Sequence, residues 1–160
     1  FEESYGYLTG SYVRDKDGVD GAYMICEMFS YYATNGISLL DKLDDLYKIY
    51  GYCLNTLHSY EFDGSAGFAK MQSIMQAFRG DIKEFGGKKV VKLLDYAPGL
   101  DGLPKSDVLK FLLEDNCSIV VRPSGTEPKL KTYISVSAEN KETAEMVEAD
   151  IRKSAEKYLK

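Results

Sequence analysis

Residues 108–136, VLKFLLEDNCSIVVRPSGTEPKLKTYISV, decide the fold. The stretch contains three runs rich in apolar and β-branched residues, predicted as strands over 108–113, 118–122 and 130–136. In the last run, apolar residues and a threonine alternate with polar or aromatic ones, which predicts a strand with one buried face. The first two runs turn back at Asp115-Asn116, so we expect antiparallel pairing.

The rest of the chain adds helices on both sides of this stretch. The predicted elements are a helix over 19–35, a helix from the cap Ser38 to Gly51, a strand over 52–62, a helix over 66–78, a strand over 88–96, a loop over 97–105, and a final helix capped by Asn140. Because this order lacks regular βαβ alternation, we predict an α+β fold: an antiparallel sheet with helices packed on one face, preceded by a helical hairpin. The expected boundary divides the chain into 1–51 and 52–160.

Helical spacing also predicts which side chains are buried. The helix over 66–78 places one apolar row toward the sheet, namely Phe68, Met71, Ile74, Met75 and Phe78. The final helix does the same with Ala144, Val147, Ile151, Ala155 and Tyr158. The hairpin within 19–51 has apolar stripes that need a partner surface.

Composition and charge argue against several classes of protein. The 160 residues are 44% hydrophobic and 28% charged with a net charge of -5, which argues against a nucleic-acid binder. No apolar run approaches the ~20 residues of a membrane span, and no basic segment precedes an apolar one as in a signal peptide. Three dispersed cysteines, Cys26, Cys53 and Cys117, form no metal or disulfide pattern, so we expect reduced thiols in a cytoplasmic protein. The chain begins with Phe1 within a loop-like segment, and we expect it to be a fragment.

The loop Arg122-Pro123-Ser124-Gly125-Thr126-Glu127-Pro128 lies between two predicted strands and carries donors suited to phosphate. Arg122 offers a planar fork for two hydrogen bonds, and Ser124 and Thr126 add hydroxyl groups. Gly125 lets the backbone turn so that successive amides form an anion nest. Lys129 and Lys131 raise the local potential. On composition alone, an ordinary polar hairpin loop is the favoured interpretation of these residues.

Two segments near the amino end are further candidates. Glu2 and Ser4, two residues apart, are able to accept from and donate to neighbouring sugar hydroxyls, although an exposed acidic end is the simpler interpretation. In Arg14-Asp15-Lys16-Asp17-Gly18, either a cation faces a phosphate or the segment is a solvated turn with a helix cap. His58 is the single histidine and is expected to be structural, since no nucleophile–base pair surrounds it.

Three motifs in order carry a family resemblance: FEESYG from residue 1, VRDKDG from residue 13, and RPSGTEPKLKTYISV from residue 122. The chain resembles the α-D-phosphohexomutases over essentially its whole length, and the phosphoglucomutase/phosphomannomutase branch most closely. The resemblance implies four domains around a cleft, with residues 1–51 the tail of the third, sugar-binding domain and 52–160 the fourth, phosphate-binding domain.

The resemblance also implies roles for individual residues. Glu2 and Ser4 match the sugar-binding pair, and Lys16, less clearly Arg14, matches a phosphate contact. The phosphate loop of the fourth domain corresponds to Arg122, Ser124, Gly125 and Thr126.

The chemistry implied is interconversion of hexose 1-phosphate and hexose 6-phosphate, glucose more than mannose, through a phosphoserine and a bisphosphorylated sugar. Mg²⁺ assists the transfer, but the catalytic serine loop and the metal loop belong to the first two domains, and neither motif occurs in this sequence. The fragment is therefore expected to bind a phosphosugar, to have the upstream domains of its own chain as partners, and to be inactive alone.

Two rival interpretations stay open at this point. One is a separate binding module for phosphorylated ligands, and the other is an interaction domain that docks through its helical hairpin.

Overall fold

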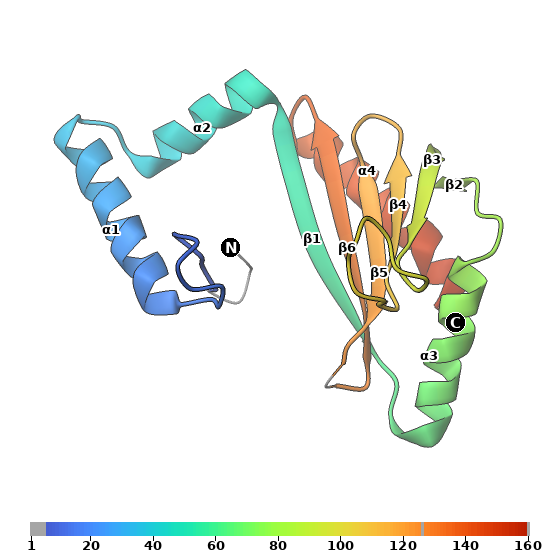
Figure 1. Cartoon of the computed structure of the whole chain (residues 1–160). Helices are drawn as coiled ribbons and strands as arrows, with labels where there is room; N and C mark the ends of the chain where they lie inside the picture. Colours follow the sequence, from blue (N-terminus) through green and yellow to red (C-terminus); the bar gives the residue numbers. More distant parts are fainter. Residues whose placement is uncertain (1–5, 126, 160) are drawn as a thin grey trace. The chain divides into compact units, whose positions relative to one another are not determined.

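The computed structural model describes residues 6–125 and 127–159. The chain divides into two compact units, Phe1–Tyr50 and Gly51–Lys160. Figure 1 follows the chain from the first unit to the second.

The first unit contains a loop and two helices. Helix α1 spans Gly18–Thr34, and the carboxylate of Asp17 caps it by accepting a hydrogen bond from the amide of Val19 at 2.8 Å. Helix α2 spans Leu39–Tyr50. Ser38 is its cap, because the Ser38 hydroxyl accepts from the amide of Asp41 at 3.0 Å. This confirms the predicted cap.

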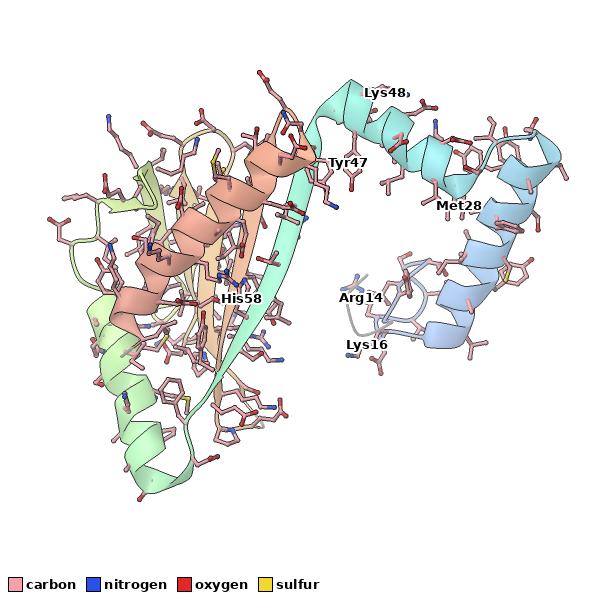
Figure 2. All side chains as sticks on the ribbon, turned by 180° about the vertical axis from the view of Figure 1, so that it is seen from behind. Arg14, Lys16, Met28, Tyr47, Lys48 and His58 are labelled. Carbon is pink, nitrogen blue, oxygen red and sulfur yellow. The ribbon has the colours of Figure 1, made fainter. Side chains whose placement is uncertain are left out.

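The apolar side chains of both helices remain largely exposed within the described residues. On α1 they include Tyr23, Met28 and Phe29, and on α2 Leu40, Leu46 and Ile49. Figure 2 shows Met28 on α1 and Tyr47 on α2. The two helices therefore leave most of their apolar stripes exposed. Such stripes are usually buried against a partner surface, as the sequence predicts for this hairpin.

The second unit is built on a six-stranded antiparallel sheet. In chain order its elements are β1 Tyr52–Glu61, α3 Gly64–Phe78, β2 Glu84–Phe85, β3 Lys88–Asp95, β4 Leu109–Leu113, β5 Ser118–Pro123, β6 Lys129–Ala138, α4 Lys141–Ala155 and the short 3-10 helix η1 Glu156–Tyr158. In space the strand order is β1-β6-β5-β4-β3-β2, so the last strand lies beside the first. The predicted antiparallel sheet is confirmed.

The core lies between one face of the sheet and helices α3 and α4. Buried strand residues Phe111, Ile119 and Ile134 meet buried helix residues such as Phe78 and Ile151. Figure 1 shows α4 behind the sheet and the connection between β3 and β4 in front of it. The sheet thus has a core face covered by helices and an opposite face, here called the open face.

The predicted burial is confirmed for most positions, although Val147 and Tyr158 of the final helical segment are only half-buried and one residue of α3 is exposed. Met71, Ile74, Met75 and Phe78 are buried, but Phe68 is 60% exposed. Phe68 lies in the first turns of α3, ahead of the part that contacts the core, so its place on the apolar stripe is insufficient to bury it.

Strand β2, with only two residues, was absent from the predicted elements because so short a run has no alternation to detect. At the other end of the unit, the Asn140 side chain accepts from the amide of Thr143 at 2.9 Å and caps α4 as predicted.

Candidate phosphate-binding site

The loop singled out from the sequence is the connection between the neighbouring strands β5 and β6. The amide of Ser124 donates to the carbonyl of Lys129 at 2.7 Å, which closes the hairpin. The amide of Phe62, just after β1, donates to the carbonyl of Pro128 at 2.8 Å. Backbone bonds to two strands therefore hold both ends of the loop.

Arg122 is the residue before the last in β5 and is exposed. Its guanidinium carbon lies 6.0 Å from the ring centre of Tyr133 on β6, a cation–π distance. Among the described residues, no carboxylate forms an ion pair with Arg122. The guanidinium is thus supported by an aromatic ring while its donors remain open to an anionic ligand.

A second cation faces the same side of the sheet. Lys131 is directly opposite Arg122 in the β5–β6 register. Side chains directly opposite each other share a face, with Cβ atoms about 4.5–5.5 Å apart. An anion bound between the two side chains would offset the repulsion between their charges, and Lys131 has no ion pair in the described part of the chain.

The loop backbone adds further donors. Gly125 and Glu127 are exposed, and no described residue accepts a hydrogen bond from either amide. Gly125 is outside the left-handed region, and a Cβ built on it would meet no atom within 4 Å. The turn therefore does not itself require a glycine at this position, which differs from the reason that the sequence suggested.

Lys129 is occupied by carboxylates instead of being free for a ligand. Its ammonium lies 3.1 Å from Glu127 and 3.4 Å from Glu61. The hydrogen bond to Glu127 raises the pKa of Lys129 above its ordinary value. This pair ties the loop to β6, so Lys129 contributes less to the potential at the loop than its charge suggests.

Three of the predicted site residues, Glu2, Ser4 and Thr126, lie outside the described residues, and their roles stay predictions. Lys16 and Arg14 are exposed in the loop before α1, where Figure 2 labels them. The amide of Lys16 donates to the Asp15 carboxylate at 2.8 Å. Asp17 acts as the helix cap that the alternative interpretation of this segment expected, and a phosphate contact from either cation stays a prediction.

His58 lies on the core side of β1, beside α4 (Figure 2). Its Nε2 is 2.7 Å from Oε1 of Glu148, a residue of α4 that is only 7% exposed. The Thr56 hydroxyl donates to the same carboxylate oxygen at 2.8 Å. This cluster links the edge strand to α4 through partly buried polar contacts. Glu148 lies on the same helical stripe as Ala144 and Ile151, but the partners that satisfy its carboxylate cannot be predicted from that spacing.

The structural roles of Tyr133 and Arg79 were not predicted from the sequence. Only the strand register reveals that Tyr133 and Arg122 share a face. Arg79, at the end of α3, donates to Asp95 at 2.9 Å and to Asp107 at 2.6 Å and so joins the helix to both ends of the β3–β4 connection. Neither contact has a motif in the sequence.

Residues 6–125 and 127–159 contain no group of three or more histidine, cysteine, aspartate or glutamate side chains able to hold a metal ion. In the same residues, no helix is long and apolar enough to cross a membrane.

Residues 64–154 match the model of the family described as "Phosphoglucomutase/phosphomannomutase, C-terminal domain". The chain belongs to this family. The match covers α3, the strands from β2 to β6 and nearly all of α4, and it includes the β5–β6 loop. The resemblance seen in the motifs is therefore confirmed, and with it the fold class.

Curated phosphoglucomutases are similar over most of the chain. The phosphoglucomutase of Staphylococcus saprophyticus is 36% identical over 152 residues, and that of Staphylococcus aureus strain MSSA476 is 39% identical over the same length. Each alignment covers 88% of this chain but 27% of the relative. The chain thus spans about a quarter of the length of these mutases.

A solved structure shares the fold. The crystal structure of the Paramecium exocytosis-sensitive phosphoprotein pp63/parafusin, a phosphoglucomutase in its open form, superposes with a TM-score of 0.67. It covers 98% of this chain and 29% of that one, at 22% sequence identity. At this identity the likeness supports the fold alone.

Proposed function

We propose that this chain is the phosphate-binding end of a phosphohexomutase that interconverts hexose 1-phosphate and hexose 6-phosphate. The observation that carries the proposal is the juxtaposition of Arg122 and Lys131 on one face of the β5–β6 hairpin. The loop that joins these two strands has exposed residues at Gly125 and Glu127. Membership of the phosphoglucomutase/phosphomannomutase family supports the assignment of a phosphosugar as the ligand.

The donor set suits the phosphate dianion. Arg122 is able to donate two parallel hydrogen bonds, and Lys131 supplies a compact charge at the other side of the anion. The backbone amides at Gly125 and Glu127 provide fixed dipoles that need no reorganisation on binding. Such contacts depend on the phosphate and not on the identity of the sugar, so the same loop can hold a phosphate at either end of a hexose.

In the whole protein, we propose that residues 1–51 belong to the third domain and 52–160 form the fourth. Glu2 and Ser4 would contact sugar hydroxyls, and Lys16 and Thr126 would contact phosphate, as the resemblance implies. Mg²⁺ would stabilise the charge on the transferring phosphoryl group, held by residues outside this chain. Glucose phosphates as the substrate, the upstream domains as partners and a cytoplasmic location remain predictions of the same kind.

The contribution of this chain to catalysis would be binding energy. A phosphate held away from the reacting centre fixes the orientation of the sugar and lowers the entropic cost of the transfer. The loop would therefore bind the phosphate that is not being transferred.

The test is phosphate binding by Arg122→Ala, measured by isothermal titration calorimetry with glucose 6-phosphate at low ionic strength. Loss of the charge-assisted bonds should weaken binding by about 1.5–3 kcal/mol. Arg122→Lys keeps the charge but not the fork, so we expect an intermediate affinity.

Lys153→Ala is the matched control, because Lys153 is exposed on α4, on the opposite side of the sheet. It removes one positive charge without touching the site. If the Arg122→Ala and Lys153→Ala variants bind glucose 6-phosphate with equal affinity, Arg122 is not part of the site. The proposal that this loop binds phosphate would then be wrong.

A further inference from the structure

The open face of the sheet carries more positive charge than one phosphate needs. Lys110 on β4 is opposite Val120 of β5, two residues before Arg122, and therefore faces the same side as Arg122. Lys92 on β3 is opposite Leu112, two residues after Lys110. Both lysines thus project from the open face.

These cations form a diagonal row across four strands. Lys131 and Arg122 are directly opposite each other, and each later step, to Lys110 and then to Lys92, moves one strand sideways and two residues along. Diagonal neighbours in an antiparallel sheet have Cβ atoms about 7–8 Å apart. The row therefore begins at the phosphate loop and extends away from it over the sheet.

The β3–β4 connection in front of this face carries Asp101 and Asp107. Asp107 is paired with Arg79, and among the described residues neither aspartate forms an ion pair with a lysine of the row. Strands β3 to β6 place no carboxylate on this face, since Asp95 is on the core side with Arg79. Glu61, on the edge strand β1, is occupied by Lys129. Among the described residues, neither Lys92 nor Lys110 has an ion pair. A surface charged only for solubility carries both signs interspersed, whereas the charged side chains of strands β3 to β6 on this face are all positive.

We propose that Lys110 and Lys92 form a second anion subsite, so that this unit binds sugars with two phosphate groups more tightly than sugars with one. The inference rests on the proposed function, because it assumes that the first phosphate is held at Arg122 and Lys131. A hexose with phosphates at both ends separates the two anions by the length of the sugar, which suits the diagonal spacing. In diphosphate the two phosphorus atoms share one oxygen, so both phosphates would remain near Arg122.

The test compares fructose 1,6-bisphosphate, fructose 6-phosphate and diphosphate by calorimetry at low ionic strength, using the 160-residue chain. We expect the bisphosphate to bind about tenfold more tightly than the monophosphate, as an added charge-assisted contact predicts. In Lys92→Gln/Lys110→Gln, this advantage should fall to about twofold or less, while the affinities for the monophosphate and diphosphate stay within about twofold of the wild type.

The matched control is Lys153→Gln/Lys157→Gln, which removes the same charge from exposed positions on α4 and η1. It should keep the bisphosphate advantage. An equal loss in the control would mean a general field effect and would overturn the subsite. A loss of diphosphate affinity alone in the Lys92/Lys110 variant would overturn it as well.

The two proposals fail in different ways. If the wild type binds the monophosphate and bisphosphate equally, the second subsite is wrong while the proposed function stands. If the wild type binds neither sugar phosphate, both proposals are wrong.

Discussion

At Gly125, the effect of a substitution on folding can be distinguished from its effect on ligand binding. It has an ordinary backbone conformation and empty space where a side chain would be, so folding alone leaves the position free to vary. It is exposed and lies in the loop that we propose as the phosphate site. A methyl group here would project into the space that a phosphate approaching the loop needs.

We therefore expect Gly125→Ala to leave stability unchanged or to raise it by about 0.4–1 kcal/mol, through lower entropy of the unfolded chain. Phosphate affinity should fall by about tenfold because the methyl group obstructs the anion. Urea unfolding measures the first effect and calorimetry with glucose 6-phosphate the second.

Gly99→Ala is the comparison variant, since Gly99 has a φ of +91° and lies in the β3–β4 connection. That substitution should destabilise the chain by about 1–2 kcal/mol without a specific effect on phosphate affinity. Full affinity in Gly125→Ala would indicate that no ligand approaches the loop at this point.

At the scale of elements, the strand alternation and helical spacing predicted every long element. The rows on β6 and α3 are buried because their periods match the geometry of a strand and a helix. The strand and helix periods do not predict which elements are joined by polar contacts. Glu148 bonding to β1 and Arg79 bonding to the β3–β4 connection depend on residues about 90 and up to 28 positions apart.

The Arg79 contact makes stability depend on pH. Hydrogen bonds from the guanidinium of Arg79 hold the pKa of Asp95 below its usual value, against the opposing effect of partial burial. A carboxyl with a lowered pKa in the folded state stabilises the protein fully above its unfolded pKa, about 3.9, and loses that stabilisation as the pH falls through the folded value.

We expect Asp95→Asn to lower the free energy of unfolding by about 1 kcal/mol at pH 7, because the contact is partly solvated. The difference from the wild type should shrink as the pH falls below about 4. Urea unfolding between pH 2.5 and pH 7 measures it. Asp101→Asn, in the same connection but exposed, is the control. A difference that stays constant down to pH 2.5 would contradict an ionic origin.

At the scale of the whole molecule, the chain covers 27% of the curated phosphoglucomutases that it matches. Its first unit exposes apolar helix faces, and its second unit has a complete core of its own. Phosphoryl transfer needs a nucleophile and a metal ion together with the remote phosphate contact. A phosphate loop alone supplies only the last of these.

We therefore expect this chain by itself to give no conversion of glucose 1-phosphate to glucose 6-phosphate in a coupled assay with Mg²⁺. The full-length phosphoglucomutase of Staphylococcus aureus, assayed in the same buffer, is the positive control. Clear turnover by the 160-residue chain, after contaminating mutase has been excluded, would contradict the proposal that the catalytic nucleophile and the metal site lie outside this chain.

The sequence by itself determined the element types, the caps at Ser38 and Asn140, and the loop that begins at Arg122. These depend on local spacing and on side chains that bond to their own backbone, and both can be read along the chain. Only the tertiary structure decided that Tyr133 supports Arg122, that Glu148 bonds to His58 and Thr56 of β1, and that Lys131 is opposite Arg122. Each of these contacts depends on strand register or on helix packing, which bring distant residues together and leave no local pattern.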